Sequence, residues 1–103
     1  MNTTALLIID IQNDYFPGGL MELDKAAEAA EKAALILTHF RKNQLPVYHI
    51  QHESVSEGST FFLPGTEGQK INQVVKPEKN ETVVVKNFPN AFVQTGLFEK
   101  LKE

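Results

Sequence analysis

Two charged residues at the ends of apolar segments are the first candidates for chemistry. Asp10 follows the apolar run Ala5 to Ile9, and Lys86 closes the β-branched run Thr82 to Val85. In open α/β sheets, functional sites lie just beyond the carboxyl ends of the strands. Each charge alone could be structural, Asp10 as an acceptor for nearby amides and Lys86 as a solvated lysine. Because a charge beside a buried strand is costly unless it is paired, we expect the two to pair.

A carboxylate beside an ammonium group can activate a nucleophile. The acid accepts the proton of the nucleophile, and the cation stabilises the anion that forms. A cysteine suits this arrangement because its thiolate is the reactive form and a neighbouring cation lowers its pKa. The sequence contains no cysteine, which excludes a thiol nucleophile, a disulfide and a thiolate metal site within these residues. The chain therefore carries half of such a catalytic site.

The elements that must position these residues can be located from hydrophobic periodicity. Continuous apolarity predicts strands covered on both faces, and helices are predicted where apolar residues recur at 3.6-residue spacing. The expected elements are a strand within Thr4 to Ile11, a helix from about Lys25 to Lys42, a strand at Val47 to Gln51, a short helix within Gln69 to Val75, a strand at Thr82 to Lys86, and a helix at Gly96 to Glu103 capped by Thr95.

The long helix has start and stop signals of its own. Asp24 is the expected N-cap, Asn43 the expected left-handed residue at the end, and Pro46 prevents continuation. The expected buried face consists of Ala27, Ala30, Ala34 and Leu37, joined by Ala26, Ala33 and Phe40. Its small side chains favour close packing of this helix on a sheet.

Alternation of strands and helices predicts one domain, residues 1–103, of the α/β class. Parallel strands joined by right-handed crossovers then form a three-layer α/β/α arrangement. Three strands are few for such a sheet, and the last helix has no strand to cross over to. We therefore expect a fold that is incomplete over these residues, with another strand to follow Glu103.

Two sequence blocks carry a resemblance to a known family. The segment from Asp10 to Phe16, DIQNDYF, resembles the D-x-Q-N-D-[FY] opening of the isochorismatase-like cysteine hydrolases. Lys86, followed by Asn90-Ala-Phe92 and Thr95-Gly-Leu97, is similar to the second block of that family. The resemblance extends from Thr4 to Leu101.

This resemblance implies a Rossmann-like α/β/α fold and a Cys-Asp-Lys triad. Asp10 would be the general base and Lys86 the stabiliser of the thiolate. The cysteine of the family lies after the next strand, beyond Glu103, so the chain by itself is expected to be inactive. The implied reaction is hydrolysis of a C–N amide or vinyl ether bond in a small molecule. The alternative is a cysteine-less, non-catalytic homologue that serves as a binding or oligomerisation module.

The second strand and the long loop after it supply further candidates. His52 is expected to face the site and contact substrate, and Phe16 and Phe92 lie near the triad positions, where pocket lining and core packing are both possible. A loop that contains Phe61 and Phe62 is expected to cover a site or a partner subunit.

No metal or other cofactor is expected. The nicotinamidase branch of the family has an Asp-x-His zinc motif after its second strand, whereas this chain has Ile50-Gln51-His52 there. His49 and His52 alternate along one strand, and neighbouring positions on a strand face opposite sides. We interpret His49 as structural.

Composition and charge restrict the partners. Ten basic and thirteen acidic residues give a net charge of −3 without a basic face, which argues against binding to nucleic acid. The longest apolar run is too short for a bilayer, and no signal peptide precedes it, so a cytoplasmic protein is the default expectation. A receiver-like signalling module is disfavoured because Ile9 precedes Asp10, where such modules need a second acid. The family resemblance implies a homo-oligomer.

Overall fold

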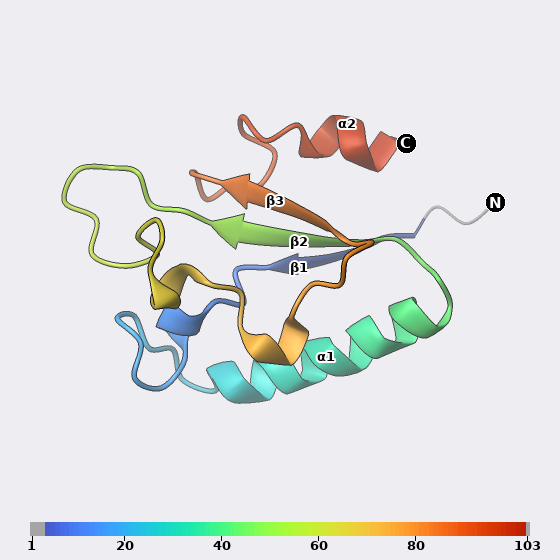
Figure 1. Cartoon of the computed structure of the whole chain (residues 1–103), viewed down its shortest axis with the longest axis horizontal. Coiled ribbons are helices and arrows are strands. Elements are labelled where there is room, and N and C mark those ends of the chain that lie inside the picture. Colours follow the sequence, from blue (N-terminus) through green and yellow to red (C-terminus); the bar gives the residue numbers. More distant parts are fainter. Residues whose placement is uncertain (1–3, 103) are drawn as a thin grey trace.

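The computed structural model describes residues 4–102 and contains a parallel β-sheet between two helices (Figure 1). Its strands are β1 (Leu6–Ile9), β2 (Val47–His52) and β3 (Thr82–Lys86), its helices are α1 (Ala26–Lys42) and α2 (Leu97–Lys102), and its short 3-10 turns are η1 (Asn13–Tyr15), η2 (Glu67–Gln69) and η3 (Gln73–Val75). The predicted α/β class with parallel strands is confirmed.

The three strands lie in the order β1-β2-β3. Ile9 is paired with Ile50, and His52 is paired with Lys86 at the end of the other ladder. All arrowheads point to the same end of the sheet, where the loops after β1 and β2 gather (Figure 1). The register therefore brings the ends of three strands to one rim, although Asp10 and Lys86 are far apart in sequence.

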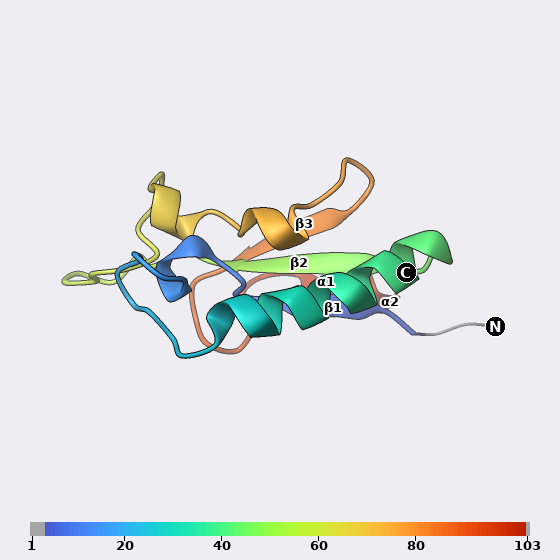
Figure 2. The same cartoon turned by 90° about the horizontal axis from the view of Figure 1, so that it is seen from below.

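Alternating side chains of the strands form two separate cores. On one face, Ile8 and Val47 pack with Leu37 of α1 and Val75 of η3. On the other face, Ile50 and Val84 pack with Leu97 of α2. Figure 1 shows α1 below the sheet and α2 above it, and Figure 2, seen from below, shows α1 in front of the sheet. The predicted three layers are thus confirmed for residues 4–102.

The start of α1 differs from the prediction. Lys25, with a φ of 62°, occupies the N-cap position, and no side chain caps the helix there. The prediction of Asp24 as N-cap is therefore wrong, because the left-handed turn at Lys25 places Asp24 one residue too early. Ala27 is exposed, and the buried face is formed by its predicted neighbours such as Ala30 and Leu37.

The end of α1 also differs in detail. Asn43 has a φ of −98°, and the left-handed residue is Gln44, with a φ of 54°. The side-chain amide of Asn43 instead donates to the carbonyl of His39 at 2.8 Å. Asn43 thus satisfies a helix-end carbonyl through its side chain, and the backbone reverses one residue later than predicted.

The connection from β2 to β3 contains no regular helix in the described residues. The predicted helix within Gln69–Val75 is wrong, because that segment is split between η2 and η3. Thr66 and Asn72 each accept a backbone hydrogen bond that starts one of these turns. Two separate caps therefore divide the segment. At α2 the predicted cap is present, since the Thr95 hydroxyl accepts from the amide of Leu97 at 3.2 Å.

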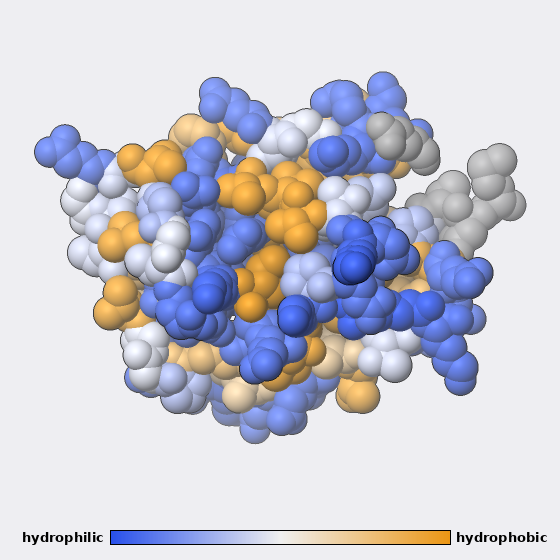
Figure 3. Space-filling model, in the orientation of Figure 1, coloured by the Kyte–Doolittle hydropathy of each residue, from blue (hydrophilic) through white to orange (hydrophobic). Residues whose placement is uncertain are grey.

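One face of the molecule carries exposed hydrophobic surface. Figure 3 shows hydrophobic residues gathered over the middle of this face, in the region of β3 in Figure 1. Val83 and Val85 of β3 are 41% and 42% exposed. Within residues 4–102, β1 is paired along one edge only, and Ile9 at its end is 45% exposed. No helix among these residues is long and apolar enough to span a membrane.

Candidate active site

Asp10 directly follows β1 in a strained backbone conformation. Its φ is 60°, in the left-handed region that few residues other than glycine adopt. Its amide donates to the carbonyl of Ile50 on the central strand at 3.0 Å, which fixes the turn. Strained residues of this kind concentrate at functional sites, where the surrounding structure holds them in place.

Lys86 ends β3 with a side chain that is almost completely buried. It is 2% exposed, and its Nζ lies 3.3 Å from Oδ2 of Asp10. The same nitrogen lies 2.9 Å from Nδ1 of His52 and donates to the carbonyl of Phe88 at 3.2 Å. The structure thus brings Asp10 and Lys86 together, and it adds His52 from the end of the strand between them.

One oxygen of Asp10 remains without a partner. Oδ2 faces Lys86, whereas Oδ1 is buried and has no hydrogen-bond partner among the described residues. Buried carboxylate oxygens without a partner are costly and rare. An unused acceptor beside a buried cation is an arrangement that can receive a proton from a third group.

His52 lies where burial and charge favour its neutral form. Burial lowers the pKa of its imidazole, and the neighbouring ammonium of Lys86 lowers it further. The carboxylate of Asp10 acts in the opposite direction and is the smallest of the three influences. Because the ordinary pKa of histidine is about 6.5, the ring is mainly neutral at pH 7.

Gln12 is a residue of the site that the sequence interpretation missed. It is fully buried, and its side-chain amide makes hydrogen bonds to both backbone groups of His52. Nε2 donates to the carbonyl at 2.9 Å, and Oε1 accepts from the amide at 2.8 Å. Nε2 also donates to the carbonyl of Gln69 at 2.7 Å. Gln12 thus binds the last residue of β2 on its β1 side, beyond the Ile9–Ile50 pair at which the β1 ladder ends.

Asp14 is a second missed residue, and it holds the loop that covers the site. It is 3% exposed, and its carboxylate accepts from the amide of Phe62 at 2.7 Å and from that of Leu20 at 3.2 Å. A β-carbon added at Gly68 would collide with this carboxylate. The sequence did contain one indication that Gln12 and Asp14 belong to the site, because both lie within the DIQNDYF block that begins at Asp10.

A cavity of about 230 Å³ opens between the charged pair and the aromatic loop. Its lining residues are Asp10, Tyr15, His52, Phe61, Phe62, Lys86 and Pro89. The ring of Phe62 lies 4.8 Å from that of Tyr15 and 5.7 Å from that of His52. The loop that contains Phe61 and Phe62 was predicted to cover either a site or a partner subunit. In the structure it covers the candidate site of its own chain. Phe62 is 1% exposed.

Tyr15 lies between this cavity and a second one. Burial raises the pKa of its phenol, and the nearby Asp10 carboxylate raises it further. The second cavity, of about 210 Å³, lies on the other side of Asp10 and Tyr15 and is lined by apolar residues that include Phe16. Phe16 is therefore close to Asp10, although it does not line the cavity that contains Lys86.

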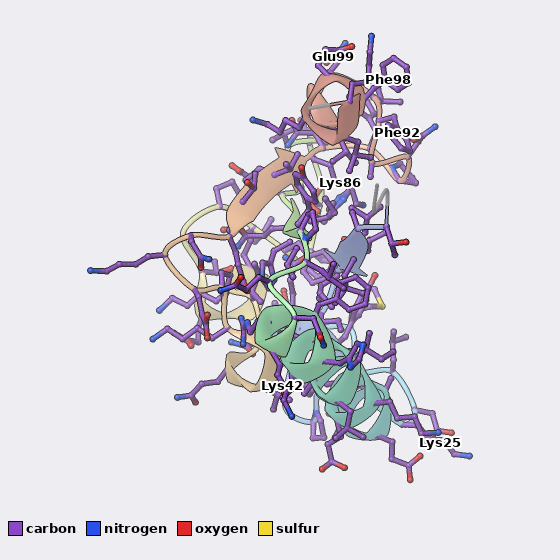
Figure 4. All side chains as sticks on the ribbon, turned by 90° about the vertical axis from the view of Figure 1, so that its right-hand side faces the viewer. Lys25, Lys42, Lys86, Phe92, Phe98 and Glu99 are labelled. Atoms are coloured by element: carbon purple, nitrogen blue, oxygen red, sulfur yellow. The ribbon has the colours of Figure 1, made fainter. Side chains whose placement is uncertain are left out.

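Phe92 lies apart from the charged pair. It is 50% exposed and lies in the loop between β3 and α2, and Figure 4 shows it on the α2 side of Lys86. Its amide donates to the side chain of Asn90 at 2.9 Å. Of the three predicted substrate-binding residues, the structure thus places His52 in the cavity with Asp10, Phe16 next to it, and Phe92 outside it.

His49 faces the opposite side of the sheet from the site. Its Nε2 lies 2.7 Å from Glu81, which also accepts two hydrogen bonds from Arg41 at 2.6 and 2.7 Å. These contacts lower the pKa of Glu81 to about 2, and the hydrogen bond from Arg41 is the main cause. Within residues 4–102 no three histidine, aspartate or glutamate side chains converge as metal ligands.

Comparison with known proteins places this chain in a family. A model of the isochorismatase domain matches residues 4–103. The uncharacterized isochorismatase family protein YddQ of Bacillus subtilis (strain 168) is 52% identical over 101 residues, which cover 98% of this chain and 56% of that protein. YrdC, an uncharacterized isochorismatase family protein of the same organism, is 34% identical over 98 residues, which cover 95% of this chain and 51% of that protein. The chain thus spans about half the length of these relatives.

Crystal structures give the same result. A protein of Oleispira antarctica assigned as an isochorismatase hydrolase is 44% identical with a TM-score of 0.93, covering 98% of this chain and 55% of that one. An isochorismatase family protein of Desulfovibrio vulgaris is 28% identical with a TM-score of 0.89, and the match covers 99% of this chain and 62% of that one. N-carbamoylsarcosine amidase of Thermoplasma acidophilum, 20% identical, shares the fold with a TM-score of 0.87 over 95% of this chain and 60% of that one.

Proposed function

Because this chain belongs to the isochorismatase family, we propose that it forms part of a cysteine hydrolase in which Asp10 is the general base and Lys86 stabilises the thiolate. The substrate is a small molecule that is cleaved at a C–N amide or vinyl ether bond. Residues 1–103 are the N-terminal portion of its single domain. The thiol comes from chain beyond Glu103, in the half that the longer relatives possess.

One observation supports this proposal more than any other. Oδ2 of Asp10 lies 3.3 Å from Nζ of Lys86, and Oδ1 is buried without a hydrogen-bond partner in residues 4–102. An ion pair that served stability alone would gain from additional hydrogen bonds to its carboxylate. A carboxylate with an unused oxygen can instead take a proton from a nucleophile placed next to it.

For an amide substrate, the proposed steps balance as follows. Asp10 removes the thiol proton, and the sulfur forms a bond to the carbonyl carbon of the amide. The carbon–nitrogen bond breaks, the nitrogen leaves with the proton held by Asp10, and a thioester remains. Water then loses a proton to Asp10 and attacks the thioester, which releases the acid and returns the proton to sulfur. Throughout, Lys86 provides the fixed positive charge beside the sulfur.

The cavity above the charged pair supports a small, largely apolar substrate. Its walls are the rings of Tyr15, Phe61 and Phe62, and its charged groups are Asp10 and Lys86. We propose that His52 contacts the substrate from its edge and that Phe16 contributes through the neighbouring cavity. Phe92 lines neither cavity, so its predicted contact with substrate is the least supported of the three. A cytoplasmic homo-oligomer is also part of the proposal.

Asp10→Asn in the complete protein tests the role of the base. We expect ammonia release from primary amides to fall at least about 1,000-fold. The variant should stay folded under the assay conditions, although loss of the ion pair with Lys86 lowers its free energy of unfolding by about 1–3 kcal/mol. Asp24→Asn is the matched control, because Asp24 is exposed and lies away from the cavity. Turnover of Asp10→Asn near the parental rate would exclude Asp10 as the base.

The absence of cysteine from the 103 residues favours a second candidate, a non-catalytic homologue that binds a small molecule or assembles with other subunits. The intact mass of the expressed protein and its reaction with iodoacetamide separate the two. One modified thiol whose reaction rate falls in Lys86→Met supports the hydrolase. A protein that ends at Glu103 and takes up no label is the binding homologue.

A further inference from the structure

We propose that His52 is a positioning residue for Lys86, and that Gln12 holds His52 in place for this purpose. In this arrangement the neutral ring accepts a hydrogen bond at Nδ1 and carries its proton on Nε2. The inference rests on the proposed function, since it assigns Lys86 a direction in which to meet the thiolate. The contacts of Nζ with His52 and Phe88 keep the flexible side chain of Lys86 in a single orientation.

The hydrogen-bond chemistry of Lys86 determines the tautomer of His52. A charged lysine has three N–H donors and no acceptor. Its Nζ lies 2.9 Å from Nδ1 of His52, so Nδ1 must be the acceptor and must lack a proton. The proton of the neutral ring is therefore on Nε2. The His52 ring lines the cavity, so this N–H is available to a substrate there.

The same contacts determine where Lys86 points. One N–H is directed to Nδ1 of His52, and a second to the carbonyl of Phe88 at 3.2 Å. The contact with Asp10 is longer, at 3.3 Å, and is an ion pair. Because two N–H groups of the ammonium are directed to these acceptors, the third points toward Asp10. An anion next to Asp10 is then within its reach.

His52 can hold the lysine only if it is itself fixed. The buried amide of Gln12 accepts from its backbone N–H and donates to its carbonyl. The ring of Phe62 lies 5.7 Å away, and Asp14 fixes the amide of Phe62. The backbone and the ring of His52 are thus held by different elements, and both contacts involve residues of the DIQNDYF block.

Protonation of His52 would break this arrangement. The titratable groups around the ring are Asp10 after β1, Tyr15 in η1 and Lys86 in β3. A second proton on the ring would remove the acceptor at Nδ1 and place two cations next to each other. Burial and Lys86 both lower the pKa of His52, so the neutral ring persists at pH 7 and is lost at acid pH.

Nitrogen-15 NMR of the complete protein tests the tautomer without any need for turnover. At pH 7.5 we expect Nδ1 of His52 to show the shift of an unprotonated acceptor and Nε2 that of a protonated nitrogen. A proton on Nδ1 would overturn the inference. The expected tautomer in a protein without thiol-dependent turnover would contradict the proposed function and leave the contact between His52 and Lys86 intact.

Two substitutions test the role of the contact. His52→Leu should lower kcat by roughly 10- to 100-fold, because a hydrogen bond to a charged group is lost, and should raise KM as well, because the proposed contact of the ring with substrate is lost. His52→Asn keeps an acceptor near the position of Nδ1, so kcat should stay within about threefold of the parent. Asn does not titrate. In His52→Asn, the fall of kcat at acid pH should therefore depend on one proton fewer than in the parent protein.

His39→Leu on the exposed side of α1 is the matched control and should change neither parameter. Equal losses in His52→Leu and His52→Asn would reduce the ring to a packing role. A rise in KM alone would make His52 a substrate contact only. Either result would refute positioning.

Discussion

Replacement of Lys86 by methionine tests the charge pair independently of any activity. Methionine is close in length to lysine and suits an apolar environment, so the change removes the charge and its hydrogen bonds while keeping most of the volume. Lys86 is 2% exposed and makes its contacts with Asp10, His52 and Phe88 through Nζ. The substitution therefore leaves an unpaired carboxylate and an unpaired ring nitrogen.

The expected magnitude follows from the geometry. Two unit charges 3.3 Å apart interact by about 5 kcal/mol at an effective dielectric constant near 20. The side chain of Asp10 is 26% exposed, so water partly replaces the lost cation. We expect Lys86→Met to lower the free energy of unfolding by about 3 kcal/mol, in the range for one broken partner of a buried pair.

Urea unfolding at pH 7 measures this change, with Lys79→Met at an exposed position as the control. Asp10→Asn and the double variant complete a mutant cycle, for which we expect a coupling energy of about 1–3 kcal/mol. A loss below about 0.5 kcal/mol in Lys86→Met, equal to the control, would refute the reasoning. It would mean that the ammonium group is solvated rather than buried against Asp10.

Two further predictions concern other buried polar groups. Because the pKa of Glu81 is about 2 in the folded protein and near 4.5 when unfolded, its stabilisation is complete above pH 4.5 and is lost as the pH falls toward 2. Glu81→Gln should therefore cost about 2 kcal/mol at pH 7 and much less at pH 2.5 in urea unfolding, and an equal loss at both values would contradict this. Gln12→Leu should cost about 3 kcal/mol, because it leaves the two backbone groups of His52 without partners. A cost below about 1 kcal/mol would show that water replaces the amide.

The position of the site could be predicted from the sequence because it depends on one general rule. Parallel strands end at the same edge of a sheet, so the first charged residue after each of two buried strands is placed at that edge. Asp10 and Lys86 satisfied this rule, and their contact follows from the register of β2 with its two neighbours. The boundaries of β3 were predicted to the residue, since the segment is β-branched throughout and charged at its end.

Features that depend on distant partners could not be predicted in this way. Gln12 bonds to a residue 40 positions away, and Asp14 to one 48 positions away. Their side chains resemble those of ordinary turn residues until β2 and the aromatic loop are in place. The predicted caps of α1 were wrong by one residue at each end, because the left-handed conformations occur at Lys25 and Gln44, which are not residue types that usually adopt them.

The geometry around Asp10 and Lys86 bears on how the proposed site would be preorganised for the thiol. Asp10, His52 and Lys86 come from the ends of three hydrogen-bonded strands, and their contacts need no residue outside 4–102. The contacts among these three side chains therefore do not depend on the proposed thiol. A thiol that enters next to Lys86 meets a cation whose donors are already directed and a carboxylate with a free oxygen. The energy needed to orient these groups is then supplied by folding of this sheet, and little reorganisation is left for the chemical step.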